Sequence, residues 1–139
     1  RYPSDLSDAE WALIAPLIPP AKHGGRKREV DVREVMNGVL YVLETGCQWR
    51  ALPKDLPPKS TVHDYLMLWG VSAGGWQMAR AANAAQQMLD AEQGDSDFCR
   101  TKILSCLYYA RQVLPQGRAH AEAIQAQDLP AEALDQWVS

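Results

Sequence analysis

Basic side chains are the residues of this sequence whose type and spacing best suit a chemical role, and that role is phosphate binding. Seven lie in two predicted loops, where they can meet phosphate oxygens without first being buried. They are Lys22, Arg26, Lys27, Arg28, Arg50, Lys54 and Lys59. If three or four of them engage a duplex, affinity should fall with salt at a logarithmic slope of about −3. The alternative is a solvated charged loop, the more common role of such runs.

A predicted helix begins directly after the last of these cations. Ser60 caps it, it runs to Trp69, and its inward face holds Val62, Tyr65, Leu66 and Trp69. With the proline-bearing turn before it, the pattern suggests a helix-turn-helix reader of DNA. On its outward face, Thr61 and His63 can bond base edges, whereas Asp64 would repel phosphate and Met67 and Leu68 suit a protein partner.

Other reactive residue types show no catalytic or metal-binding pattern. His23, His63 and His120 lie far apart without recognisable ligand spacing. The three cysteines form an odd set typical of reduced thiols, and Cys99 and Cys106 fit one face of a helix. We therefore expect no metal, no cofactor and no redox role.

Two helices are predicted before the candidate recognition helix. Ser7 and Glu10 form a capping box, and the apolar stripe that follows is Trp11, Ile14, Ala15 and Ile18. A second helix starts at Asp31 and ends at Gly46. Its predicted buried residues are Val32, Val35, Met36, Val39, Leu40 and Leu43.

The second half of the sequence is predicted to form a helical hairpin. A helix from about Gly75 to Gln93 carries the seam Met78, Ala82, Ala85 and Leu89, and Gly94 ends it. Asp95 or Ser96 caps the next helix, and a weaker one follows from about Arg118. The apolar stripe of that capped helix is Cys99, Ile103, Cys106, Leu107, Ala110 and Val113. No stretch favours a strand, so the predicted fold is all-α: a three-helix, helix-turn-helix-like module joined to a helical hairpin or bundle.

The amino-acid composition of this 139-residue chain changes near residue 70. Residues 1–70 hold nine Lys or Arg and nine Asp or Glu, whereas residues 71–139 hold five and eight, so the net charge of −3 belongs to the second half. Such a change can mark a domain boundary, although one helical domain with a loop-rich start remains an alternative. The longest apolar run, residues 38–43, is too short to span a bilayer and no leader opens the sequence, so we expect a cytoplasmic protein without a membrane partner.

The first half resembles the N-terminal domain of insertion-sequence transposases. The resemblance is nearly continuous over residues 1–66 and is carried by residues 2–11, 25–28, 40–53 and 57–62. In that family the region is a helical DNA-binding module followed by a catalytic domain with three metal-binding carboxylates. Nothing after residue 70 is similar to that catalytic domain, so the resemblance implies DNA binding without transposition chemistry.

Residues of about 65–126 resemble the C-terminal helical extension of acyl-CoA dehydrogenases. Residues 68–82, 97–102 and 108–115 carry this second resemblance. That family's flavin site and catalytic glutamate have no counterpart here, so the resemblance implies no catalytic residue. The join between the two patterns falls within residues 60–74.

These observations favour a non-catalytic DNA-binding module, residues 1–66, joined by a shared helix to a dehydrogenase-like helical segment, residues 67–139. The predicted phosphate contacts are Arg26, Lys27, Arg28, Arg50 and Lys54, and the side chains facing the duplex are Lys59, Ser60, Thr61 and His63. Two alternatives stay open: a helical interaction module that forms homo-oligomers through residues 75–113, and an inactive fusion relic.

Overall fold

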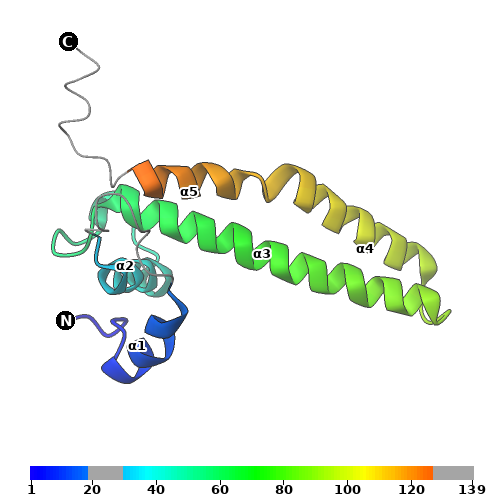
Figure 1. Ribbon diagram of the computed structural model, residues 1–139, viewed down its shortest axis with the longest axis horizontal. Coiled ribbons are helices and arrows are strands. Elements are labelled where there is room, and N and C mark those ends of the chain that lie inside the picture. Colours follow the sequence, from blue (N-terminus) through cyan, green and yellow to red (C-terminus); the bar gives the residue numbers. More distant parts are fainter. Residues whose placement is uncertain (19–29, 127–139) are drawn as a thin grey trace, which may run out of the picture. The chain divides into compact units, whose positions relative to one another are not determined.

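The computed structural model describes residues 1–18 and 30–126, which form helices and turns and contain no strand. This confirms the all-α prediction. The helices are α1 (Asp8–Ile14), α2 (Val32–Thr45), α3 (Lys59–Asp90), α4 (Ser96–Tyr108) and α5 (Gln116–Ala126) (Figure 1). Two compact units share them: a first unit of Arg1–Leu66 with the end of α5 from Ala123, and a second unit of Met67–Glu122. None of the described helices is both long and apolar enough to cross a membrane.

Helix α1 begins with the predicted capping box. The Ser7 hydroxyl accepts from the Glu10 N–H, and the Glu10 carboxylate accepts from the Ser7 N–H at 2.9 Å. The Ser7 hydroxyl also donates to this carboxylate at 2.8 Å, and the bonds that the Ser7 N–H and hydroxyl donate lower the pKa of Glu10. Trp11 and Ile14 are half-buried while Leu13 is exposed, so the predicted stripe is the inward face.

Helix α2 carries most of the core of the first unit. Asp31 caps its start by accepting from the backbone of Arg33 and Glu34, and Gly46 ends it in the left-handed conformation at φ +61°. Val35, Met36 and Val39 are buried, as the stripe predicts, and Asn37 and Gly38, which the stripe leaves out, are buried as well. The predicted burial of Leu43 is wrong, since this side chain is 63% exposed. The core covers the middle of α2 and does not reach its last turn.

The start of α3 packs directly on α2 through a glycine. Val62 is fully buried, and a Cβ placed on Gly38 would lie only 2.8 Å from its Cγ2 atom. The missing side chain of Gly38 therefore lets the two helices approach closely. This contact sets the position of the first turns of α3.

Helix α3 runs without a break from Lys59 to Asp90, so the predicted end at Trp69 and start at Gly75 are wrong, whereas the prediction that the two halves share one helix is confirmed. The physical reason lies in the segment opposite Gly74 and Gly75. A Cβ on Gly74 would collide with the Tyr109 hydroxyl, and one on Gly75 would lie 2.9 Å from Leu114 Cδ1. These glycines give room to a neighbouring helix instead of ending their own.

Helices α3 and α4 form the predicted hairpin in the second unit, where they run side by side in Figure 1. Asp95 caps α4 by accepting from the backbone of Asp97 and Phe98. Cys99 and Cys106 are buried as predicted, and the Cys106 thiol lies 3.8 Å from the Met78 sulfur. Leu107 was expected in the same stripe, but it is 47% exposed because the packed arc of α4 is narrower than predicted.

A π-helical turn, Tyr109–Val113, follows α4 and explains how Tyr109 and Leu114 both reach α3. The Leu114 N–H donates to the Tyr109 carbonyl at 2.9 Å, a bond that spans five residues instead of four. The Tyr109 hydroxyl in turn donates to the Val71 carbonyl at 2.9 Å. Pro115 follows directly, and α5 then begins at Gln116, two residues before the predicted start.

Candidate nucleic-acid interface

Three predicted phosphate-binding residues line a single hollow in the first unit. Arg50 belongs to the short 3-10 helix Trp49–Ala51, Lys54 to the turn after it, and Lys59 to the first turn of α3. All three are exposed. The predicted contacts Arg26, Lys27 and Arg28, together with Lys22, lie outside the described residues. Of the two predicted basic loops, the second is therefore the one that the described residues contain in full.

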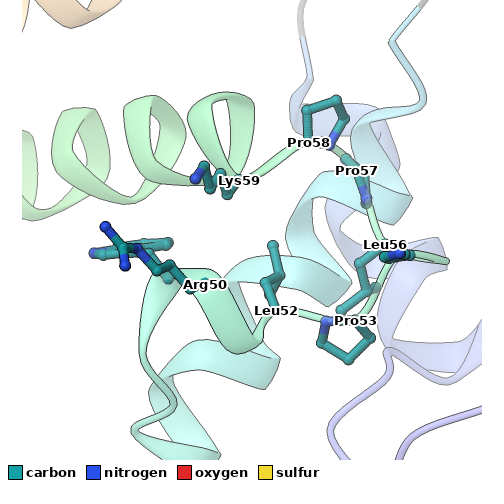
Figure 2. A pocket seen from close by; sticks show the side chains of 9 residues that line it. Arg50, Leu52, Pro53, Leu56, Pro57, Pro58 and Lys59 are labelled. Atoms are coloured by element: carbon teal, nitrogen blue, oxygen red, sulfur yellow. The ribbon is translucent and has the colours of Figure 1, made fainter.

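The hollow has a volume of about 510 Å³, and its wall is the proline-bearing turn between α2 and α3. Two backbone hydrogen bonds between residues three positions apart shape this turn. The Ala51 N–H donates to the Gln48 carbonyl at 2.8 Å, and the Leu56 N–H donates to the Pro53 carbonyl at 3.2 Å. Leu56 is buried and anchors the turn on the core. Prolines restrict the backbone, so the wall is stiff. Figure 2 shows Arg50 and Lys59 beside the hollow, with the proline turn around it.

The charges of these three cations are not neutralised within the described part of the chain. Arg50, Lys54 and Lys59 have neither an ion pair nor a side-chain hydrogen bond among those residues. Two other arginines of the first unit have structural partners instead. Arg1 pairs with Glu34 at 2.7 Å, and Arg33 pairs with Asp8 at 2.7 Å and lies over the Trp11 ring. The positive charge that can attract a ligand therefore gathers at the hollow.

Asp55, the one acidic residue between Trp49 and Lys59, is held by the start of the chain. The Tyr2 hydroxyl donates to its carboxylate at 2.8 Å, and the Arg1 guanidinium lies 3.4 Å from its other oxygen. The hydrogen bond to this carboxylate raises the pKa of the Tyr2 phenol. The charge of Arg1 and the hydrogen bond from Tyr2 thus offset the negative charge of this carboxylate, which would otherwise weaken the attraction of the three cations for an anion.

The predicted base-contacting residues at the start of α3 do not form one outward face. Ser60 is exposed and His63 is half-exposed, but Thr61 is only 6% exposed. The prediction that Thr61 faces a duplex is therefore wrong. Positions 61 and 62 are both buried, so the enclosed arc in the first turns of α3 is wider than the predicted stripe.

Sequence reasoning missed Trp49 as a site residue. Its indole lines the hollow, is half-buried, and meets the His63 ring edge-on at 5.1 Å between centroids with an interplanar angle of 74°. An aromatic ring directly before Arg50 was the available signal, because nucleic-acid sites combine aromatic rings with cations.

Two family models match the chain. The model described as "Putative transposase of IS4/5 family" covers residues 6–79, which include the whole turn that forms the hollow. The model described as "Acetyl-CoA dehydrogenase C-terminal like" covers residues 56–135. This chain belongs to the IS4/5 transposase family in its first half and to the acetyl-CoA dehydrogenase C-terminal-like family in its second. Both resemblances inferred from the residues are therefore confirmed.

A curated relative supports the transposase-family assignment. The chain is 32% identical over 96 residues to the "Insertion element IS402 uncharacterized 16.2 kDa protein" of Burkholderia cepacia. The matched segment is 66% of this chain and spans 62% of that relative's length. No solved structure matches this transposase-family chain. The two family matches overlap at residues 56–79, a segment that contains Lys59 and the first two-thirds of α3.

Proposed function

We propose that residues 1–66 bind DNA through the hollow and that this chain carries no catalytic step of its own. The observation that carries the proposal is the set of three uncompensated cations, Arg50, Lys54 and Lys59, around one concave wall. Cations that serve a protein's own structure carry carboxylate partners, as Arg1 and Arg33 do. Membership of a transposase family supports DNA over other polyanions as the ligand.

Salt dependence tests this proposal. Each phosphate neutralised on a duplex contributes about −0.9 to the slope of log affinity against log salt, so three contacts give about −2.7. Fluorescence anisotropy of a labelled random-sequence duplex, titrated at several salt concentrations, measures the slope. Replacing all three cations by alanine should weaken binding and bring the slope close to zero.

A matched control removes the same charge elsewhere. Arg80, Arg111 and Arg118 are exposed arginines of the second unit, and their triple alanine variant also changes the net charge by −3. It should keep the slope of the unmodified chain. A slope near zero for the unmodified chain, or equal losses in both triple variants, would refute binding through the hollow.

A second proposed function is self-association through residues 75–113. The observation that favours it is a group of large apolar side chains exposed on α3 and α4, namely Trp76, Phe98, Leu104, Leu107 and Tyr108. Three of these, Leu104, Leu107 and Tyr108, line one hollow on α4, and exposed apolar side chains that lie together suit a protein partner. Sedimentation velocity at low and high protein concentration tests it, and a strict monomer at both concentrations would contradict it.

A further inference from the structure

We propose that the hollow binds an unpaired nucleotide, so that the first unit prefers single-stranded or locally unpaired DNA to continuous duplex. This inference rests on the proposed DNA-binding function and assigns the form of DNA that the site takes. It follows from three properties of the hollow: its concave shape, the mixed character of its lining, and the fixed position of its aromatic ring.

The size of the hollow suits a small group that enters it. At about 510 Å³ the hollow has the size of a small-molecule site, for which about 300–1,000 Å³ is usual. A continuous duplex keeps its bases stacked inside and presents phosphates on a convex surface. It would touch the cations at the rim and leave the interior of the hollow empty. An unpaired nucleotide can place its base inside.

The lining matches all parts of a nucleotide. Arg50, Lys54 and Lys59 supply positive charge for phosphate, and no acidic residue is among the nine lining residues. The remaining wall is carbon-rich: the Trp49 indole, two leucines and three prolines. A site that binds phosphate alone gains nothing from an apolar wall, whereas the base and the sugar of a nucleotide can pack against one. Cations combined with an aromatic ring are the usual composition of single-strand binding sites.

Trp49 is the ring on which a base would stack. Its edge-on contact with the His63 ring, 5.1 Å between centroids, fixes the indole before any ligand arrives. A fixed ring loses little conformational freedom on binding, which favours affinity. Because His63 supports Trp49 in this arrangement, its role here is to position the indole and not to contact a base edge.

The alternative, insertion of the start of α3 into a major groove, fits the structure less well. A recognition helix needs an accessible outward face over its first turns. Thr61 is only 6% exposed, so one of the positions that would face the groove is enclosed. The hollow beside that helix does not have this disadvantage.

Anisotropy titrations of the full chain against three labelled forms of one mixed sequence provide the test: the single strand, its perfect duplex, and the duplex with a short unpaired gap. We expect the single strand and the gapped duplex to bind about five-fold or more tightly than the perfect duplex, since stacking on one aromatic ring is worth about that factor or more. Trp49→Ala should remove this preference, and Trp49→Phe, which keeps a ring, should retain most of it.

Two controls keep the test decisive. Leu13→Ala removes an exposed apolar side chain of the first unit that does not line the hollow, and it should leave all three affinities unchanged. Competition by thymidine monophosphate against inorganic phosphate needs no variant, so it remains informative if Trp49→Ala fails to fold. The nucleotide should displace the labelled single strand at lower concentration than phosphate does.

The outcomes distinguish a failure of the unpaired-nucleotide inference from a failure of DNA binding itself. Equal or tighter binding of the perfect duplex, or equal competition by phosphate and nucleotide, overturns the unpaired-nucleotide inference while DNA binding stands. Binding of none of the three DNA forms overturns both.

Discussion

Replacing Gly38 by alanine should loosen the contact that positions α3 on α2. The added Cβ would lie 2.8 Å from Val62 Cγ2, and Val62 is a β-branched, fully buried side chain that cannot turn aside freely. Overpacking of this kind typically costs about 1–3 kcal/mol. Alanine regains about 1 kcal/mol of helix propensity over glycine. We therefore expect a net loss of up to about 2 kcal/mol in the free energy of unfolding.

Thermal unfolding followed by far-UV circular dichroism measures this loss. For a unit of this size, each kcal/mol lowers the melting temperature by about 4–8 °C. Gly70→Ala is the matched control: position 70 is also helical, and nothing lies within 4 Å of a Cβ placed there. This variant should gain stability by about 0.5–1 kcal/mol from helix propensity alone.

A double-mutant cycle with Val62→Ala then tests the contact itself. The shortened side chain at position 62 leaves space that the new methyl group at position 38 can fill. The double variant should therefore be more stable than the sum of the single losses predicts, by about 0.5–3 kcal/mol. If Gly38→Ala is as stable as Gly70→Ala, or if the two losses simply add, the close approach of Gly38 and Val62 is not the constraint that we infer.

Three further predictions concern local features. The lowered pKa of Glu10 means that the capping box stabilises α1 at pH values above the ordinary carboxyl pKa and that this contribution is lost as the pH falls through the lowered value. Acid titration of helicity should show the loss, and Glu10→Gln should make it smaller by the share that Glu10 contributes. Tyr109→Phe removes the donor to the Val71 carbonyl and should cost about 0.5–1.5 kcal/mol in urea unfolding, whereas an unchanged midpoint would contradict the bond's role. Gly46→Ala places a side chain at φ +61° and should destabilise the end of α2 by about 1 kcal/mol, measured by thermal unfolding, while equal stability would show that the left-handed turn is not strained by a Cβ.

Several helix ends could be predicted from the sequence because a capping residue acts on backbone groups close to it in the chain. Asp31, Asp95 and Gly46 act on backbone groups within four residues, so their residue type is enough to place them. The position of Gly74 and Gly75 inside α3, where they do not end the helix, could not be predicted in this way. It depends on Tyr109 and Leu114, which lie more than thirty residues beyond the glycines that they cover.

The candidate site shows the same division between local and distant causes. The exposed cations Arg50, Lys54 and Lys59 followed from residue type and loop position. The compensation of Asp55 did not, because its partner Arg1 is 54 positions away in the sequence. Burial of Thr61 likewise depends on what surrounds the start of α3, which periodicity within one helix does not report.

The π-helical turn at Tyr109–Val113 amounts to one surplus residue stored inside an otherwise α-helical stretch. Because the wide turn takes up that residue, loss of one residue there would restore regular α-helical winding and leave Gly117 facing Val71. In a helix without such a turn, the same loss would rotate everything downstream by about 100° around the helix axis. This stretch should therefore tolerate the loss of one residue where a regular helix would not.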